Sequence, residues 1–201
     1  MEIKSNFLDL ASLRRSCYAL TNRIPIADSE LMKLVQEAVQ HAPSAFNSQS
    51  ARVLVLLGGK HIQFWKLVLE ELQKIIPPQQ FPPTGEKLNT FAAAYGTILF
   101  FEDWPTVEGL QQKYPAYKDN FPVWAYQANG MLEYMIWTAL AEQNIGASLQ
   151  HYNPLVDKAV QTAFGVPPTW KLIAQMPFGV KAGPVPNKST LPINTLVFIQ
   201  R

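Results

Sequence analysis

The stretch from residue 121 to 144 constrains the fold of this chain more than any other. Glu133 and Glu142 are its only charged residues, and large apolar side chains occur all round the helix that this length implies. These side chains are Trp124, Tyr126, Met131, Tyr134, Met135, Ile136, Trp137 and Leu140. A helix that is apolar on nearly every side must be buried on nearly every side, yet Gln127 and Asn129 interrupt it too often for a membrane span. A chain of 201 residues offers little to wrap such a helix, so the pattern predicts that a second subunit covers one face.

Length and composition describe a single globular domain, residues 1–201, that needs no disulfide or metal for its stability. Only 16% of the residues are charged, which again indicates a surface covered by a partner. The net charge of +2, without a lysine- or arginine-rich face, argues against nucleic-acid binding. The single cysteine, Cys17, excludes an intramolecular disulfide, and we expect it to be a small buried side chain. The first residues lack the long apolar run of a signal peptide, so we expect a cytoplasmic protein without membrane attachment.

Hydrophobic periodicity and turn residues predict a mixture of helices and strands. Helices are expected at residues 28–42, at 60–75, in a short stretch before 97, at 121–144, and from Asn153-Pro154 to Gly165. Strands are expected at 53–57, 97–101, 147–149, 171–176 and 195–199, the first two of them buried. This order of elements predicts an α+β domain with a small sheet, because the strands are too few and too widely spaced for a barrel.

Several kinds of catalytic site are excluded by what the sequence lacks. There is no G-x-G-x-x-G, P-loop, H-E-x-x-H or G-x-S-x-G motif, and the three histidines lack neighbours at metal-binding spacing. Glu102 and Asp103 close a strand, where they could be structural or could belong to a loop site. Hydrolase, kinase and metalloenzyme functions are therefore poorly supported.

Four polar stretches remain as candidate sites. Arg14, Arg15 and Ser16 suit a phosphate group, although such a triplet is also typical of an ordinary surface. The amides of residues 44–50 could hold the polar edge of a cofactor or simply form turns. Residues 146–153 include His151, which could line a site or be an ordinary hydrogen-bonded histidine. Finally, the loop after residue 179 carries Lys181 and Lys188, either of which could neutralise a phosphate or lie free on the surface.

Taken together, these stretches resemble one family. RRSCY, APSAFNSQ, AAYGTILFFED, and GASLQHYNP followed by QMPFG look like the FMN-dependent nitroreductases, especially their compact branch of small bacterial enzymes and yeast fatty-acid-repression relatives. The resemblance covers essentially the whole chain in the right order. It implies a nitroreductase-like α+β fold with a small central mixed sheet flanked by helices. It also implies an intertwined homodimer with FMN at the subunit interface.

The resemblance assigns cofactor contacts residue by residue. The residues expected to bind FMN are Arg14, Arg15, Ser16, Ser44, Phe46, Asn47, Gln49, Gln150, His151, Tyr152, Asn153 and Lys188. The first three would hold the phosphate and ribityl chain, residues 44–49 would line the flavin from the partner subunit, and residues 150–153 would follow its ring. Lys188, or alternatively Lys181, would complete the phosphate site, and Lys87 or Asn89 could reach the ring.

The activity that the resemblance implies is oxidoreduction. NAD(P)H would reduce the flavin and leave, and a nitroaromatic or quinone-like compound would then take the electrons, a ping-pong order in which no side chain need be an obligatory acid or base. Aromatic residues could form a flat pocket wall, or several of them could simply pack in the core or the dimer interface, at Phe46, Trp104, Tyr114, Tyr117, Phe121 and Trp124. Two alternatives stay open at this stage, a flavin-binding regulatory or redox-sensing protein with little turnover, and a flavin-free dimer that acts as an interaction module.

Overall fold

A four-stranded sheet forms the centre of the protein, whose computed structural model describes residues 7–185 and 187–201. The strands are β1 (Ala51–Leu57), β2 (Gly96–Asp103), β3 (Ile145–Ala147) and β4 (Trp170–Val180), in the order β1-β2-β4-β3. All three strand pairs are antiparallel, so the expectation of a mixed sheet was wrong. The described residues contain one parallel pairing, an isolated bridge between Ser16 and Ala147. The expected α+β architecture, a small sheet flanked by helices, is confirmed.

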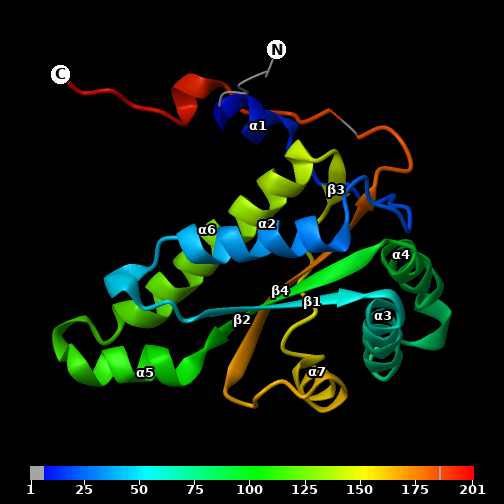
Figure 1. Cartoon of the computed structure of the whole chain (residues 1–201), viewed down its shortest axis with the longest axis horizontal. Coiled ribbons are helices and arrows are strands. Elements are labelled where there is room, and N and C mark those ends of the chain that lie inside the picture. The colour runs from blue at the N-terminus through cyan, green and yellow to red at the C-terminus, as the bar shows by residue number, and fades with distance from the viewer. Residues whose placement is uncertain (1–6, 186) are drawn as a thin grey trace.

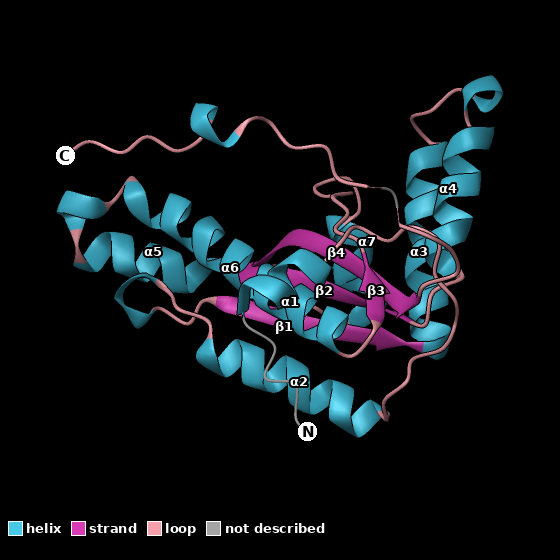
Figure 2. Cartoon of the chain, turned by 90° about the horizontal axis from the view of Figure 1, so that it is seen from above, coloured by secondary structure: helices cyan, strands magenta, loops and turns pink. Residues whose placement is uncertain are grey.

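Helices cover both faces of the sheet (Figures 1 and 2). The helices of the described residues are α1 (Phe7–Leu13), α2 (Asp28–His41), α3 (Gly58–Gln73), α4 (Pro82–Ala92), α5 (Trp104–Lys113), α6 (Asn120–Glu142) and α7 (Asp157–Phe164), of which α1 and α5 pack against α6. Helices α2 and α6 pack on one face, where Leu31, Phe100 and Leu132 belong to one buried cluster. Helices α3, α4 and α7 pack on the other, where Phe64, Leu99 and Val160 belong to a second.

Local signals explain where several elements begin and end. The Glu30 carboxylate accepts a hydrogen bond of 2.9 Å from the Ala27 N–H and so satisfies an otherwise unpaired donor at the start of α2. Pro43 follows the last turn of that helix, because a proline pushes the residue before it out of the helical conformation. Gly165 ends α7 in the left-handed conformation, with a φ of 66°.

Other expectations were wrong in their details. Asn153-Pro154 does not start a helix; it forms a cis peptide bond within a turn, and α7 begins three residues later. Residues 195–199 are not a strand: Thr195 ends a 3-10 turn at Ile193–Thr195, and the residues that follow it have no strand assignment. Strand β1 is half-buried rather than buried, since it lies at the edge of the sheet. Helices α1 and α5 were not foreseen.

The N-terminal segment after α1 crosses the β3–β4 end of the sheet. The Thr21 N–H donates to the Val180 carbonyl at 2.8 Å, and the Val180 N–H donates to the Arg23 carbonyl at 2.8 Å. This crossing is so close that a Cβ on Gly179 would lie 2.2 Å from the Thr21 oxygen. Glycine is therefore required by the approach of two backbones, and the crossing fixes residues 14–21 beside the sheet.

Helix α6 runs across the face of the sheet with one side left open. Its sheet-facing residues are buried, whereas Val123 and Met131 are exposed to 52% and 44%. The protomer thus covers only part of the apolar helix. None of the helices among the described residues is long and apolar enough to cross a membrane.

Candidate functional site: two separated half-sites

Arg14 and Ser16 lie in a fixed position between α6 and β3. The Arg14 guanidinium stacks over the ring of Trp137, with its Cζ 4.3 Å from the ring centroid. Ser16 forms the bridge to Ala147, and the next residue, Cys17, donates its N–H to the Ala147 carbonyl at 2.8 Å. A cation–π contact of this kind holds the arginine without consuming its hydrogen-bond donors.

The same region has positive charge and unsatisfied donors. Arg14 Nε and Trp137 Nε1 are buried, and neither finds an acceptor among the described residues. Burial raises the pKa of the Cys17 thiol, while Lys181, Arg15 and Arg14 act in the opposite direction, which places these three cations around it. A buried donor without an acceptor is costly, so this group of donors and cations suits an anionic ligand that supplies acceptor oxygens. A phosphate group meets that requirement.

Gln175 on β4 shapes the 150–153 segment. Its side-chain oxygen accepts a hydrogen bond of 2.7 Å from the Tyr152 N–H, and its amide nitrogen donates to Asn153 Oδ1 at 3.2 Å. Its backbone pairs with that of Gln150 in both directions, at 2.7 and 2.9 Å. Gln175 is fully buried, so the turn after β3 is fixed from beneath by one side chain.

The side chains of residues 150–153 differ in their exposure and in their hydrogen bonds. Gln150 is buried and donates its amide to Ser148 Oγ at 3.1 Å, whereas the His151 side chain is exposed. Tyr152 packs edge-on against Trp65, and burial raises the pKa of its hydroxyl to about 12. At neutral pH the tyrosine is neutral and can serve as a hydrogen-bond donor but not as a base.

The 44–49 loop forms a second polar unit. Ser44 Oγ accepts a hydrogen bond of 3.0 Å from the Gln49 N–H, and the Ser44 carbonyl accepts one of 3.0 Å from the Asn47 N–H. Phe46 lies at the tip, 51% exposed, with its ring 4.8 Å from that of Tyr114 and stacked on Trp124 at 6.1 Å. Tyr117 and Phe121 complete this aromatic cluster.

The two polar units lie at opposite ends of α6. Phe46 of the loop contacts Trp124, whereas Arg14 stacks on Trp137, thirteen residues further along the helix. At 1.5 Å per residue this separates the two contact points by roughly 20 Å. One protomer therefore brings Arg14, Arg15 and Ser16 close to the 146–153 segment but does not bring the 44–49 loop to them.

The lysines occupy different environments. Lys181 lies beside Gly146 and Cys17, next to the arginines, whereas Lys188 is exposed on the C-terminal tail. Lys87 and Asn89 lie on the exposed side of α4, where Lys87 Nζ is 5.8 Å from the Phe91 ring. Of these lysines, Lys181 is thus the one that adds its charge to the region around Arg14.

Comparison with known proteins shows to which family the chain belongs. Residues 11–180 match the model of the nitroreductase family. The chain belongs to that family. The nitroreductase FRM2 of Saccharomyces cerevisiae is 31% identical, over 98% of this chain and 98% of its own. Nitroreductase CinD from Lactococcus lactis, solved in complex with chloramphenicol and with 4-nitrophenol, is 38% identical over 98% of this chain and 100% of its own, with a TM-score of 0.89.

A more distant structure adds the fold alone. A nitroreductase with bound FMN from Desulfitobacterium hafniense is 20% identical and covers 96% of this chain, with 97% of its own length matched and a TM-score of 0.71. The described residues contain no group of three or more histidine, cysteine, aspartate or glutamate side chains that could hold a metal ion.

Three residues that shape the candidate site were missed by sequence reasoning. Trp137 was assigned to general packing, and Gln175 and Arg52 were not singled out at all. Gln175 carried a signal, since it is a polar residue in the middle of the apolar strand 171–178 and must find partners there. Arg52 carried none, because an arginine on an edge strand is ordinarily exposed.

Proposed function

We propose that this protein is an FMN-dependent oxidoreductase that takes electrons from NAD(P)H and delivers them to nitroaromatic or quinone-like acceptors. The observation that carries the proposal is the region around Arg14, in which buried donors without acceptors among the described residues lie near cationic side chains of a nitroreductase chain. These residues fit the phosphate of FMN. Bound FMN would supply the hydride and electron transfer, for which this chain offers no substitute of its own. We expect the protein to work in the cytoplasm.

Each group of residues has a proposed task. Arg14, Arg15 and Ser16 would bind the phosphate and ribityl chain, with Lys181 beside them and Lys188 reaching in only if the tail folds back. The 150–153 segment, held by Gln175, would present main-chain groups and the neutral Tyr152 hydroxyl along the flavin ring. None of these side chains is arranged as a nucleophile–base pair, which agrees with a ping-pong reaction in which donor and acceptor use the same place in turn.

A homodimer would complete this site. Since about 20 Å separates Arg14 from the 44–49 loop along α6, one flavin would have to draw on two protomers to contact both. Two copies related by a two-fold axis, with the open sides of α6 facing each other, would bring the loop of one to the arginines of the other. The exposed Val123 and Met131 would then be buried, as an apolar stripe requires.

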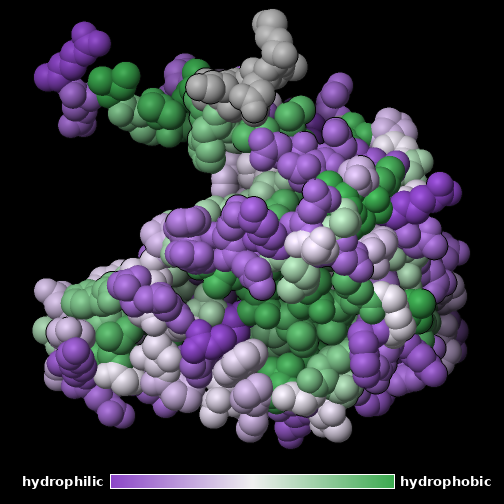
Figure 3. Space-filling view, viewed as in Figure 1, coloured by the Kyte–Doolittle hydropathy of each residue, from purple (hydrophilic) through white to green (hydrophobic). Residues whose placement is uncertain are grey.

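The C-terminal tail supports intertwined subunits. Its apolar side chains are 55–80% exposed in the protomer, at Leu191, Ile193, Leu196, Val197, Phe198 and Ile199. Strand β1 lies at the sheet edge and borders a cavity of about 650 Å³ under α2, where Figure 3 shows a hydrophobic surface. An exposed edge and an uncovered apolar tail are both unfavourable in water. The tail of one copy would cover this edge and groove of the other.

The proposed acceptor class follows from the aromatic cluster at Phe46. Flat rings from the loop, from Tyr114–Tyr117 and from the start of α6 would form a wall suited to planar aromatic compounds. CinD, at 38% identity, has been solved with chloramphenicol and with 4-nitrophenol, both of which carry a nitro group on a benzene ring.

The test is an absorbance spectrum of the full-length protein after addition of FMN and desalting, followed by anaerobic NADPH or NADH and then 4-nitrophenol. Retained flavin bands that bleach with the nicotinamide and return with the acceptor are expected. Flavin that stays bound but does not bleach would instead favour a redox-sensing protein. A protein that keeps no flavin would refute the proposal.

Two variants and one control sharpen the test. Arg14→Ala should weaken FMN binding by at least tenfold, whereas Lys33→Ala, on the exposed face of α2, should leave the affinity unchanged. Removal of residues 189–201 should convert a dimer to a monomer in sedimentation velocity. A truncated protein that remains dimeric would contradict the role proposed for the tail.

A further inference from the structure

The 44–49 loop has an unfavourable backbone conformation. Phe46, Asn47 and Gln49 have φ values of 55°, 50° and 48°, in the left-handed region that residues with a Cβ rarely adopt. Three such residues within four positions persist only where the surroundings hold them in place. The loop itself is closed by the hydrogen bond from the Gln49 N–H to Ser44 Oγ.

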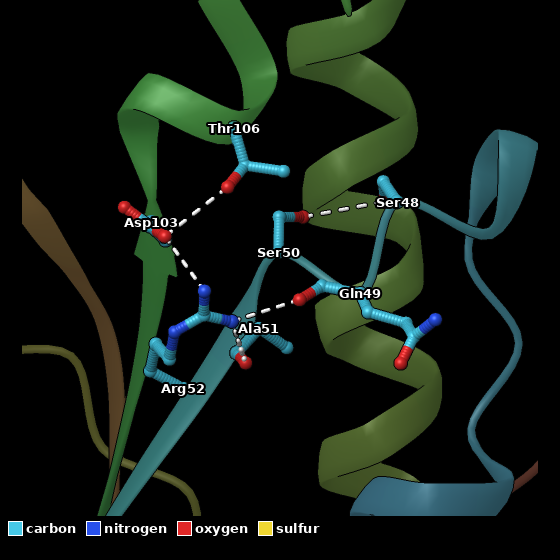
Figure 4. Close-up of polar contacts among 7 residues, drawn as sticks. All are labelled: Ser48, Gln49, Ser50, Ala51, Arg52, Asp103 and Thr106. Atoms are coloured by element: carbon cyan, nitrogen blue, oxygen red, sulfur yellow. Dashed lines mark hydrogen bonds and ion pairs between the residues drawn. The ribbon is translucent and has the colours of Figure 1, made fainter. Parts of the chain in front are cut away.

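Arg52 binds the carbonyl side of Gln49 and so fixes the end of the loop (Figure 4). Its Nη1 donates to the Gln49 carbonyl at 2.8 Å and to the Ala51 carbonyl at 3.0 Å. Its Nη2 forms an ion pair of 2.6 Å with Asp103 Oδ2, which also accepts a hydrogen bond of 3.1 Å from Thr106. The guanidinium thus links the strained residue of the loop to the end of β2 and the start of α5.

The hydrogen bonds of Arg52 go to the loop, to the start of β1 and to Asp103, and its guanidinium also lies 5.7 Å from the ring centroid of Trp170, which packs against the core. The β1–β2 backbone ladder runs from Ala51↔Glu102 to Leu57↔Gly96 without help from this side chain. Arg52 and Asp103 are only partly buried, with side-chain exposures of 32% and 19%. Removing the guanidinium would therefore leave the sheet paired while it frees the Gln49 carbonyl.

We infer that Arg52, held by Asp103, is a positioning residue that keeps the 44–49 loop in its flavin-binding conformation before the cofactor arrives. The inference rests on the proposed FMN function, since that function assigns Ser44, Asn47 and Gln49 to the flavin. If only a fraction of molecules has the loop in this conformation, the apparent dissociation constant rises by the inverse of that fraction. Arg52 acts through the loop and need not touch the flavin.

The experiment uses the full-length protein and measures first the order of the 44–49 loop without FMN and then the affinity for FMN. Hydrogen exchange of the Asn47, Ser48 and Gln49 amides, all of which donate hydrogen bonds within the loop, reports its order in the flavin-free protein. FMN fluorescence quenching gives the dissociation constant. Arg52→Met should exchange these amides about tenfold faster and bind FMN about tenfold more weakly, a change equal to about 1.4 kcal/mol.

Graded variants and a matched control separate positioning from general destabilisation. Arg52→Lys should restore part of the affinity, because one ammonium can reach only one of the two partners. Asp103→Asn, which keeps an oxygen acceptor, should weaken FMN binding by about threefold. Lys74→Met removes an exposed ion pair of the same 2.6 Å length, to Glu71, and should leave both measurements within twofold of wild type.

Each result decides the inference. Unchanged exchange and unchanged affinity in Arg52→Met would overturn it, and so would faster exchange with normal affinity, because the loop would then not belong to the flavin site. A wild-type protein that binds no FMN would overturn the proposed function and this inference with it. That failure is distinguishable because it is seen in the wild type, whereas the others are seen only in the variant.

Discussion

Substitution of Glu133 tests the burial of a charge in α6. The side chain is 7% exposed, and no hydrogen bond or ion pair reaches its carboxylate from the described part of the chain. Desolvation therefore raises the pKa of Glu133 from 4.5 to about 7. Glu133→Gln keeps the shape of the side chain and removes the charge.

The effect depends on pH in a defined direction. Below pH 4.5 the carboxyl group is protonated in both the folded and the unfolded chain, and the folded state keeps its full stability. As the pH rises from 4.5 to about 7, the Glu133 carboxyl ionises in the unfolded chain while it stays protonated in the folded chain. The free energy of unfolding therefore falls over this range and stays low above it. The two pKa values differ by about 2.5, and each pH unit corresponds to about 1.4 kcal/mol, so the loss is roughly 3 kcal/mol. Glu133→Gln should therefore gain about 3 kcal/mol over wild type above pH 7 and almost nothing below pH 4.5.

Urea unfolding at pH 4.5 and pH 8, followed by tryptophan fluorescence at one fixed protein concentration, measures this difference. Glu142→Gln, at the exposed end of the same helix, is the matched control and should show no such pH dependence. A stability gain of Glu133→Gln that is equal at the two pH values would show that the carboxylate finds a compensating partner in solution. The reasoning from burial would then be refuted.

Two further substitutions test the packing that supports the site. Thr97 Oγ1 is hydrogen-bonded to Trp65 Nε1 at 2.9 Å and to His61 Nδ1 at 2.8 Å. Thr97→Val would leave both nitrogens without this partner and should lower the free energy of unfolding by urea by about 2–4 kcal/mol. A loss under about 0.5 kcal/mol would contradict the buried network. Gly179→Ala would place a Cβ 2.2 Å from a main-chain oxygen and should cost about 3 kcal/mol in thermal unfolding. Gly183→Ala, where a Cβ meets nothing within 4 Å, should be close to neutral, and equal effects of the two would refute the steric argument.

Local sequence determined most of the elements. The apolar run of α6, the proline after α2 and the glycine after α7 act within a few residues, and the structure has these elements close to the expected positions. The strand at residues 195–199 was wrong for a different reason. Its continuous run of apolar, partly β-branched residues is typical of a strand, but a strand needs a neighbour, and the described residues provide none for the tail.

The candidate site was only partly readable. Residue types suited to a phosphate and to a cofactor ring could be found at Arg14 and in the 44–49 loop, because charge and amide chemistry belong to the side chains themselves. Their separation along α6 could not, because it depends on which ends of the helix the two segments pack against. The same holds for Gln175 and Arg52, whose roles arise from partners 23 and 51 positions away in the chain.

The sequence by itself therefore determined the kinds of elements, the family and the chemical character of the polar stretches. Only the tertiary structure decided which of these stretches meet within one protomer and which remain apart. The physical reason is the distance along the chain over which each kind of interaction acts. Helix and turn preferences act over a few neighbouring residues, whereas a binding site is assembled by packing contacts between segments that are distant in the chain.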